Sequence, residues 1–160
     1  GGVSVGDADF VKDVIDELGD IDFWKVAIKP GKPFAFGKIS QTFFCGLPGN
    51  PVSAYVTTDQ IVAPLLRVLQ GETKHSQTHR LTLKAQVTKD YARRAGRKEF
   101  LRAVWHTDES GKMWVTPLQK QSSGVMSTVT QANCYLVLDA SQARIEAGED
   151  VLIQPFSLSC

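Results

Sequence analysis

The sequence predicts an α/β layer over residues 1–71, followed by a small all-β barrel-like domain over residues 80–160. Helical and strand-like apolar patterns alternate in the first part, whereas the second part holds only short, mostly alternating runs. The stretch between them, residues 72–79, is polar and lacks a pattern, as is typical of a linker. We therefore predict two units joined over residues 72–79.

The first part opens with a glycine-rich loop and a helix. In GGVSVGDADF the glycines allow a tight bend, and Asp7 or Asp9 can cap a helix whose apolar positions run over residues 10–18. Such a loop normally joins a strand to a helix, and here no strand precedes it. We expect the chain to be a fragment of a longer protein.

Strands and a second helix complete this part. The run IDFWKVAIKP alternates, which predicts a strand with one buried face and one face that carries Lys25 and Lys29. The runs FAFGKI and TFFCG predict two further strands. A long helical pattern covers residues 51–69, with Asn50 as its N-cap, and Pro64 is expected to kink it.

The second part is predicted to contain strands alone. The runs RLTLKAQV, EFLRAVWH, KMWVTP, CYLVLD and EDVLIQPF are short, and turn residues separate them. No helix is expected here. We predict a small antiparallel domain, either a barrel or a sandwich.

The composition excludes some classes of protein. A net charge of +1 argues against a surface built as a whole for nucleic acid, although it leaves room for a local basic patch. No apolar stretch approaches the roughly 18 residues of a membrane-spanning helix. The cysteines are far apart, and Cys45 and Cys134 are expected to be buried apolar residues in strands. We expect a cytoplasmic protein that binds no membrane.

Three motifs in the first part suit an anion. GGVSVGDAD offers backbone N–H groups and the Ser4 hydroxyl, and its aspartates could hold Mg²⁺, although a helix cap explains it equally well. KVAIKPGKP places Lys25, Lys29 and Lys32 within one short stretch, where prolines fix the backbone; a solvated lysine face is the alternative. GLPGNPVSA is a tight turn into a capped helix.

Two features of the second part are less specific. KDYARRAGRKEFLR gathers basic side chains around one loop, which could bind phosphate or nucleic acid, or form an exposed hairpin tip. QSSGVMS places the adjacent hydroxyls of Ser122 and Ser123 before a glycine, which by itself indicates a turn.

Taken together, GGVSVGDAD, KVAIKPGKP, GLPGNPVSA and GRKEF followed by QSSGVMS and ANCYLVL resemble the MoeA/gephyrin family of molybdopterin molybdenumtransferases. The resemblance implies that the first part is the C-terminal half of a molybdopterin-binding α/β domain and that the second is the family's C-terminal β-domain. It implies insertion of molybdate into adenylylated molybdopterin with release of AMP, a requirement for Mg²⁺, and a homodimer for the full-length protein.

The resemblance also implies roles for particular residues. Molybdate would be surrounded by side chains from both parts of the chain: Ser4, Lys29, Lys32, Arg97 and either Ser122 or Ser123. Lys25 would add positive charge near this substrate. Asp9 would hold the metal, and Pro48 and Pro51 would shape the loop on the pterin side.

Two other functions remain open on the residues alone. The β-domain could be a scaffold that anchors partner proteins, and a partner peptide recovered with the chain would favour this. Alternatively, its basic loop could bind nucleic acid, with a steep dependence on salt. The near-neutral net charge and the lysine–proline motif favour the enzyme. We expect this chain alone to be inactive.

Overall fold

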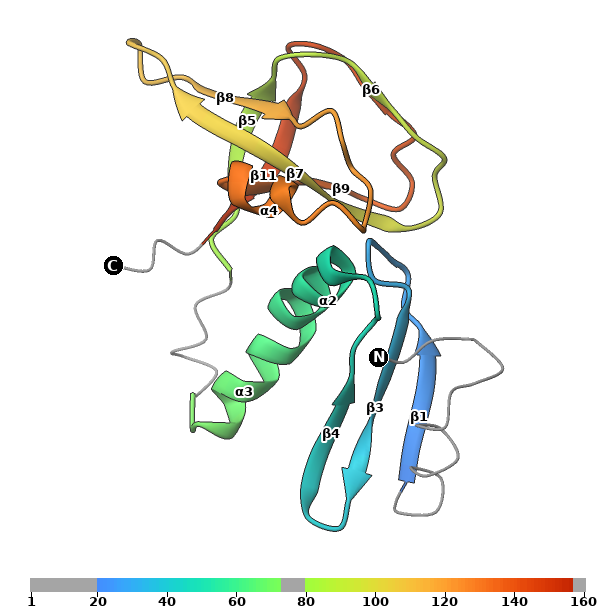
Figure 1. Ribbon diagram of the computed structural model, residues 1–160. Coiled ribbons are helices and arrows are strands. Elements are labelled where there is room, and N and C mark those ends of the chain that lie inside the picture. Colours follow the sequence, from blue (N-terminus) through green and yellow to red (C-terminus); the bar gives the residue numbers. More distant parts are fainter. Residues whose placement is uncertain (1–19, 73–79, 157–160) are drawn as a thin grey trace. The chain divides into compact units, whose positions relative to one another are not determined.

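The computed structural model describes the backbone of residues 20–72 and 80–156, and side chains from Lys25 onward. It divides into two compact units, Gly1–Glu72 and Thr73–Cys160, which are described separately (Figure 1). The helix predicted over residues 10–18 and most of the predicted linker lie outside the described residues.

The first unit contains a three-stranded antiparallel sheet in the order β1-β3-β4. Its strands are β1 (Asp20–Lys25), β3 (Pro33–Ile39) and β4 (Thr42–Gly46). The predicted strand over IDFWKVAIKP is divided, because β1 ends at Lys25 and only the two-residue β2 (Ile28–Lys29) follows. The predictions of strands at FAFGKI and TFFCG are confirmed.

The long helical pattern forms one helical rod with an irregularity in its middle (Figure 1). It consists of α2 (Pro51–Thr57), the π-helical turn η1 (Thr58–Val62) and α3 (Ala63–Leu69). The π-helical turn ends at Val62, two residues before Pro64. Pro64 has no N–H to donate, and its ring would crowd an α-helical carbonyl four residues earlier. The wider turn, with the Ala63 N–H donating to the Thr58 carbonyl, accommodates the proline where we expected a kink.

The second unit is a closed barrel of five strands, in the order β7-β8-β5-β11-β9, with β9 pairing back to β7. Its strands are β5 (Leu83–Val87), β7 (Lys98–Thr107), β8 (Met113–Pro117), β9 (Cys134–Leu138) and β11 (Asp150–Pro155). The barrel alternative is thus confirmed. The expectation of a wholly antiparallel domain is wrong, because β5 pairs with β8 in parallel.

Apolar side chains fill the interior of the barrel. Leu101, Ala103 and Leu136 are fully buried there together with Val115 and Ile153. Alternate residues of β7 and β9 point outward, and some of these are covered as well: the ring of Tyr135 packs edge-on against Phe100, with centroids 5.8 Å apart. The strand β7 is therefore buried on both faces over much of its length.

Three small elements of the second unit were not predicted. They are β6 (Tyr91–Ala92), β10 (Arg144–Ile145) and the short helix α4 (Ser127–Gln131). β6 and β10 form a two-stranded ribbon. The expectation of no helix in this part is wrong, because Ser127–Gln131 form the helix α4. This helix packs against β7.

Candidate functional site

Three strand ends meet at one end of the sheet in the first unit. Lys25, the last residue of β1, pairs with Pro33, the first residue of β3. On the other side of β3, Ala35 pairs with Gly46, the last residue of β4. Consequently the loop that joins β1 to β3 and the loop that leaves β4 begin at the same sheet end.

The first of these loops, residues 26–32, is called the lysine loop here. The Val26 N–H donates to the Lys32 carbonyl at 2.8 Å, which closes its base. The peptide between Lys29 and Pro30 is cis, and Gly31 has a φ of 118°, a conformation that L-residues with a side chain rarely adopt. Lys32 is exposed and Lys29 is half-buried.

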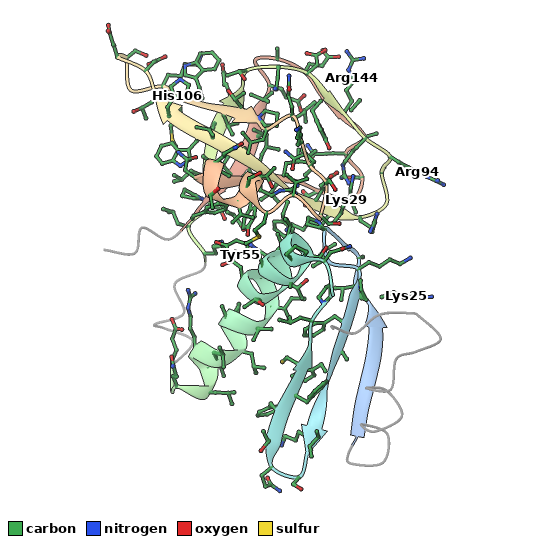
Figure 2. The ribbon with its side chains drawn as sticks, viewed as in Figure 1. Lys25, Lys29, Tyr55, Arg94, His106 and Arg144 are labelled. Atoms are coloured by element: carbon green, nitrogen blue, oxygen red, sulfur yellow. The ribbon has the colours of Figure 1, made fainter. Side chains whose placement is uncertain are left out.

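The lysine side chains are held at the sheet end and not along one strand face. Lys25 is exposed at the end of β1, and Lys29 lies in β2 within the lysine loop (Figure 2). The backbone bond at Val26 places Lys32 beside the end of β1 as well. The structure therefore places Lys25, Lys29 and Lys32 in or beside one loop at the same sheet end.

The second loop, residues 47–50, leads from β4 into the helical rod. Pro48 is buried, and Pro51 occupies the first turn of α2 as expected. Asn50 is the N-cap residue as predicted, and its side chain makes no capping hydrogen bond. Its carbonyl accepts from the Ala54 N–H at 2.9 Å and thereby begins the helix. The loop thus reaches the same sheet end as the lysines.

In the second unit, Arg97 lies directly before β7. A neighbouring arginine holds this loop: Arg93 donates from its guanidinium to the carbonyls of Arg97 and Asp139. The Gly96 N–H also donates to the Ala140 carbonyl at 2.7 Å. The loop around Arg97 is therefore attached to the segment that follows β9 by the Arg93 side chain and by one backbone hydrogen bond.

Ser122 and Ser123 lie on a different part of the barrel, in the segment that follows β8. The Ser122 carbonyl accepts from Nη2 of Arg102 at 3.4 Å. Arg102 is five residues beyond Arg97 on an extended strand, which corresponds to about 16 Å. The structure therefore brings Ser122 to Arg102, which lies further along the strand than Arg97.

The sequence groups Arg102 with the basic loop that could bind phosphate, whereas the structure buries Arg102 within β7. The residue is 1% exposed, and its Nε donates to the Thr128 hydroxyl at 3.3 Å. The side chain of Gln121 bonds to both the N–H and the carbonyl of Arg102, at 3.1 and 2.9 Å. Burial lowers the pKa of the Arg102 guanidinium from its ordinary value, against the opposing influence of Tyr135 and Glu99. A buried cation beside two hydroxyl-bearing segments is a candidate anion ligand.

A sequence signal for Arg102 does exist. In EFLRAVWH the arginine interrupts a run of apolar residues within a strand, on the same side as Phe100. A charged residue is almost never buried in such a run unless it is paired. The basic loop that precedes the strand conceals this signal, because Arg102 continues the same basic run along the sequence.

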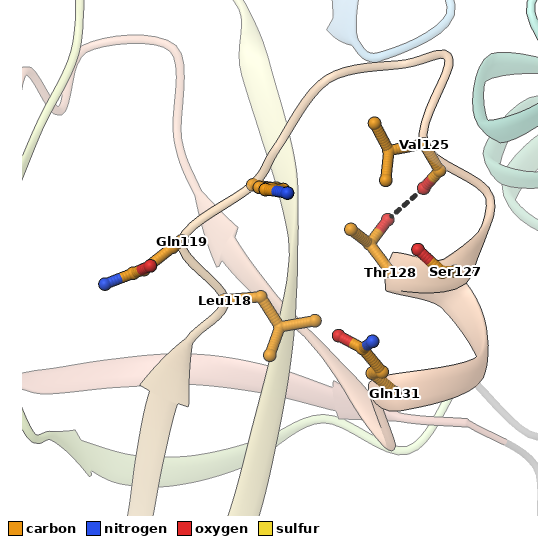
Figure 3. Close-up of a pocket in the computed structure, with 7 residues that line it drawn as sticks. Leu118, Gln119, Val125, Ser127, Thr128 and Gln131 are labelled. Carbon is orange, nitrogen blue, oxygen red and sulfur yellow. Dashed lines mark hydrogen bonds between the residues drawn. The ribbon is translucent and has the colours of Figure 1, made fainter.

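A pocket of about 330 Å³ lies next to this segment (Figure 3). It is lined by Leu118, Gln119, Lys120, Val125, Ser127, Thr128 and Gln131. The Thr128 hydroxyl donates to the Val125 carbonyl at 2.7 Å and also accepts from Arg102, so one wall of the pocket is tied to the buried arginine. The lining is mixed in polarity and includes one lysine, Lys120.

The remaining predicted site residues, Ser4 and Asp9, lie outside the described residues. Within the described ranges, no group of three or more His, Cys, Asp or Glu side chains is arranged to hold a metal ion. Among the same residues, no helix is both long and apolar enough to cross a membrane.

The sequences of both units match known protein families and relatives. Residues 84–156 match the family model of the MoeA C-terminal region (domain IV), and residues 1–68 match that of a probable molybdopterin binding domain. The molybdopterin molybdenumtransferase of Haemophilus influenzae is 45% identical over 157 residues, which are 98% of this chain and 38% of that protein. The enzyme of the same name from Bacillus subtilis is 34% identical over 96% of this chain and 35% of its own length.

The fold agrees with a solved structure as well. A molybdopterin biosynthesis MoeA protein from Pyrococcus horikoshii superposes with a TM-score of 0.71 and 27% identity, over 94% of this chain and 35% of that one. The chain thus combines part of a probable molybdopterin binding domain with a β-barrel that matches the MoeA C-terminal region. It belongs to the MoeA family. It spans less than two fifths of the length of the curated relatives named above.

Proposed function

We propose that this chain is the C-terminal part of an enzyme of molybdenum cofactor biosynthesis, a molybdopterin molybdenumtransferase. The complete enzyme would insert molybdate into adenylylated molybdopterin and release AMP. One observation carries the proposal: the sheet end gathers Lys25, Lys29 and Lys32 beside the proline loop that enters α2. The names of the relatives agree with this chemistry.

The chemistry requires a place for a tetrahedral dianion. Lysine ammonium groups are compact point charges that can replace the water around such an ion, and they need no planar partner geometry. The lysine loop would therefore hold molybdate, while the loop with Pro48 and Pro51 would border the pterin. In the barrel, Arg97 and Ser122 or Ser123 stay candidates, and the buried guanidinium of Arg102 joins them on its contact with Ser122.

Other parts of the proposal concern the complete enzyme. Mg²⁺ would be held by Asp9, where it would polarise the phosphoanhydride of adenylylated molybdopterin. Because Asp9 lies outside the described residues, no step is assigned to the metal. We further propose a homodimer in the cytoplasm, acting on small molecules and binding neither nucleic acid nor membrane. The burial of Arg93 bears on nucleic acid alone: its guanidinium is bound to Glu99 and to the Arg97 carbonyl, which leaves one basic side chain fewer for phosphate contacts.

The experiment is a titration of molybdate. In the product of the complete gene, Lys29→Ala and Lys32→Ala should each raise the molybdate concentration that gives half-maximal activity by roughly ten- to a hundredfold, since a charge-assisted contact contributes about 1.5–3 kcal/mol. A melting curve of each variant serves as the control for folding.

Tungstate, a similar oxyanion, should compete with molybdate at the same place. A solvated lysine face makes the opposite prediction, namely unchanged molybdate dependence in both variants. If Lys29→Ala and Lys32→Ala both keep the wild-type molybdate dependence, the proposed molybdate site is wrong.

A further inference from the structure

The back of the lysine loop packs against the helical rod at one close contact. Gly31 is buried, and a Cβ atom at this position would lie 2.5 Å from Oγ1 of Thr57, the last residue of α2. It would also lie 3.2 Å from Cδ1 of Ile28. Only glycine therefore allows the loop backbone to approach the threonine hydroxyl this closely.

The Thr57 hydroxyl is itself unusual. The residue is 0% exposed, and within the part of the chain that the structure describes its Oγ1 has no hydrogen-bond partner. A buried hydroxyl without a partner destabilises the fold, and valine has almost the same shape without that penalty. A threonine at this position therefore costs stability in the state described here.

The position of the Thr57 hydroxyl indicates a role in the lysine loop. Thr57 faces the segment between Lys29 and Lys32, whose base is closed by the bond from the Val26 N–H to the Lys32 carbonyl. A bond from Thr57 to the loop backbone would fix the middle of the loop as well. The two lysines would then be held at a constant spacing.

We propose that Thr57 is a positioning residue for the lysine loop: its hydroxyl hydrogen bonds to the loop backbone beside Gly31 when an oxyanion is bound, and so sets the spacing of Lys29 and Lys32. This inference rests on the proposed function, because molybdate is the oxyanion concerned. Thr57 does not touch the anion; it acts through the loop.

The test compares Thr57→Val with Thr57→Ser in the product of the complete gene. Thr57→Val should raise the half-saturating molybdate concentration by roughly three- to tenfold with an unchanged kcat, the size expected for one hydrogen bond. Its free energy of unfolding should equal or exceed that of the wild type, since an unpartnered buried hydroxyl is removed. Thr57→Ser keeps the hydroxyl and should restore the wild-type molybdate dependence.

Three further variants isolate the contact between Gly31 and Thr57: Gly31→Ala disturbs it, and Thr58→Val and Gly71→Ala are the controls. Thr58→Val makes the same chemical change one residue further along and should leave molybdate dependence unchanged. Gly31→Ala should raise the half-saturating molybdate concentration more than Thr57→Val, because it combines a positive φ with a clash. Gly71→Ala has a φ of 91° with nothing within 4 Å of the new Cβ, so it introduces backbone strain without a clash and should leave molybdate dependence unchanged.

Hydrogen exchange of the Val26 amide gives a readout besides activity. Molybdate should slow this exchange in the wild type and in Thr57→Ser, and should slow it much less in Thr57→Val. If molybdate protects Val26 equally in Thr57→Val, or if that variant keeps the wild-type molybdate dependence while Lys32→Ala loses it, the inference is overturned and the proposed function stands. If molybdate fails to protect Val26 in the wild type and both lysine variants behave as wild type, the proposed function fails with it.

Discussion

The two units position their loops by different means. In the barrel, every strand of the ring has a paired neighbour on both sides, and its loops are attached by buried charged side chains such as Arg93 and Arg102. In the described part of the first unit, the sheet has two outer strands, and its lysine loop is shaped by Pro30 and Gly31. A closed ring can bury a charge at a loop base, whereas a loop at the end of an open sheet depends more on its own backbone.

The largest expected effect concerns the ion pair at the base of the Arg97 loop. Arg93 Nε lies 3.5 Å from Glu99 Oε2, with the two side chains 3% and 2% exposed. Glu99→Ala leaves the guanidinium buried without its carboxylate, and we expect a loss of about 3–5 kcal/mol in the free energy of unfolding. Urea denaturation followed by the fluorescence of Trp105 and Trp114 in the barrel measures it.

An exposed ion pair in the same unit is the matched control. Arg144 lies 3.1 Å from Asp90, with side chains 61% and 59% exposed. Asp90→Asn should cost less than about 1 kcal/mol, because solvent screens such pairs. Equal losses in Glu99→Ala and Asp90→Asn would contradict the view that buried charge holds the barrel loops.

The second largest effect is expected in the rates at which one thiol from each unit reacts. Cys134 is fully buried in β9, where burial raises its pKa to about 12, whereas Cys45 in β4 is half-buried with a pKa raised by weaker desolvation. In a Cys160→Ser background, a thiol reagent at pH 8 should modify Cys45 at least about a hundredfold faster, because the thiolate is the reactive form. Peptide mass analysis after timed quenching assigns the rates.

Both thiols should react at similar rates in denaturant, which removes the difference in burial. Faster modification of Cys134 than of Cys45 under native conditions would mean that the barrel opens more readily than the sheet. The proposed contrast between the two units would then be reversed. The expectation that both cysteines are buried holds fully for Cys134 and only in part for Cys45.

The strands that could be predicted from the sequence are those with a long apolar pattern. The runs FAFGKI and CYLVLD contain enough apolar residues to reveal a strand, and both are strands. The ribbon β6–β10 contributes two residues from each strand, too few to show any period. The helix α4 has the sequence STVTQ, whose β-branched residues disfavour a helix, so tertiary packing against β7 must stabilise it.

In the candidate site, too, some features could be predicted from the sequence and others could not. The lysines could be found from the sequence because KPGKP concentrates charge and backbone restriction in one short stretch. The contact of Gly31 with Thr57 could not, since these residues are distant in the chain and meet only through the packing of the loop on the rod. Likewise, the proximity of Arg102 to Ser122 depends on where the segment after β8 lies on the barrel.

A smaller effect on the free energy of unfolding is expected at alkaline pH, from the titration of Tyr91. The Tyr91 hydroxyl donates to Glu99 at 3.4 Å, and burial together with this carboxylate raises the pKa of Tyr91 to about 12. Because the folded pKa lies above the unfolded value of about 10, the stabilisation is complete below pH 10 and is lost as the pH rises toward 12. Unfolding free energies from pH 9 to 12 should fall less steeply in Tyr91→Phe than in the wild type.

The smallest effect belongs to the hairpin tip between β7 and β8. The exposed Asp108 carboxylate accepts from the Ser110 hydroxyl at 2.6 Å, from the Trp114 indole at 2.7 Å and from the Lys112 N–H at 3.0 Å. These donors lower its pKa below the ordinary value, led by the serine hydroxyl and the indole. A depressed folded pKa means that the stabilisation is present above the unfolded value near 3.9 and is lost as the pH falls below it.

Asp108→Asn keeps one acceptor oxygen in the turn and removes the titration. We therefore expect the variant to be slightly less stable than the wild type at pH 7, with the difference shrinking as the pH falls from 5 toward 2. Denaturation at a series of pH values, followed by Trp114 fluorescence, measures the difference, and Glu109→Gln removes a neighbouring carboxylate as the control. A difference independent of pH would show that the turn depends on the shape of the side chain and not on its charge, since asparagine supports similar turns.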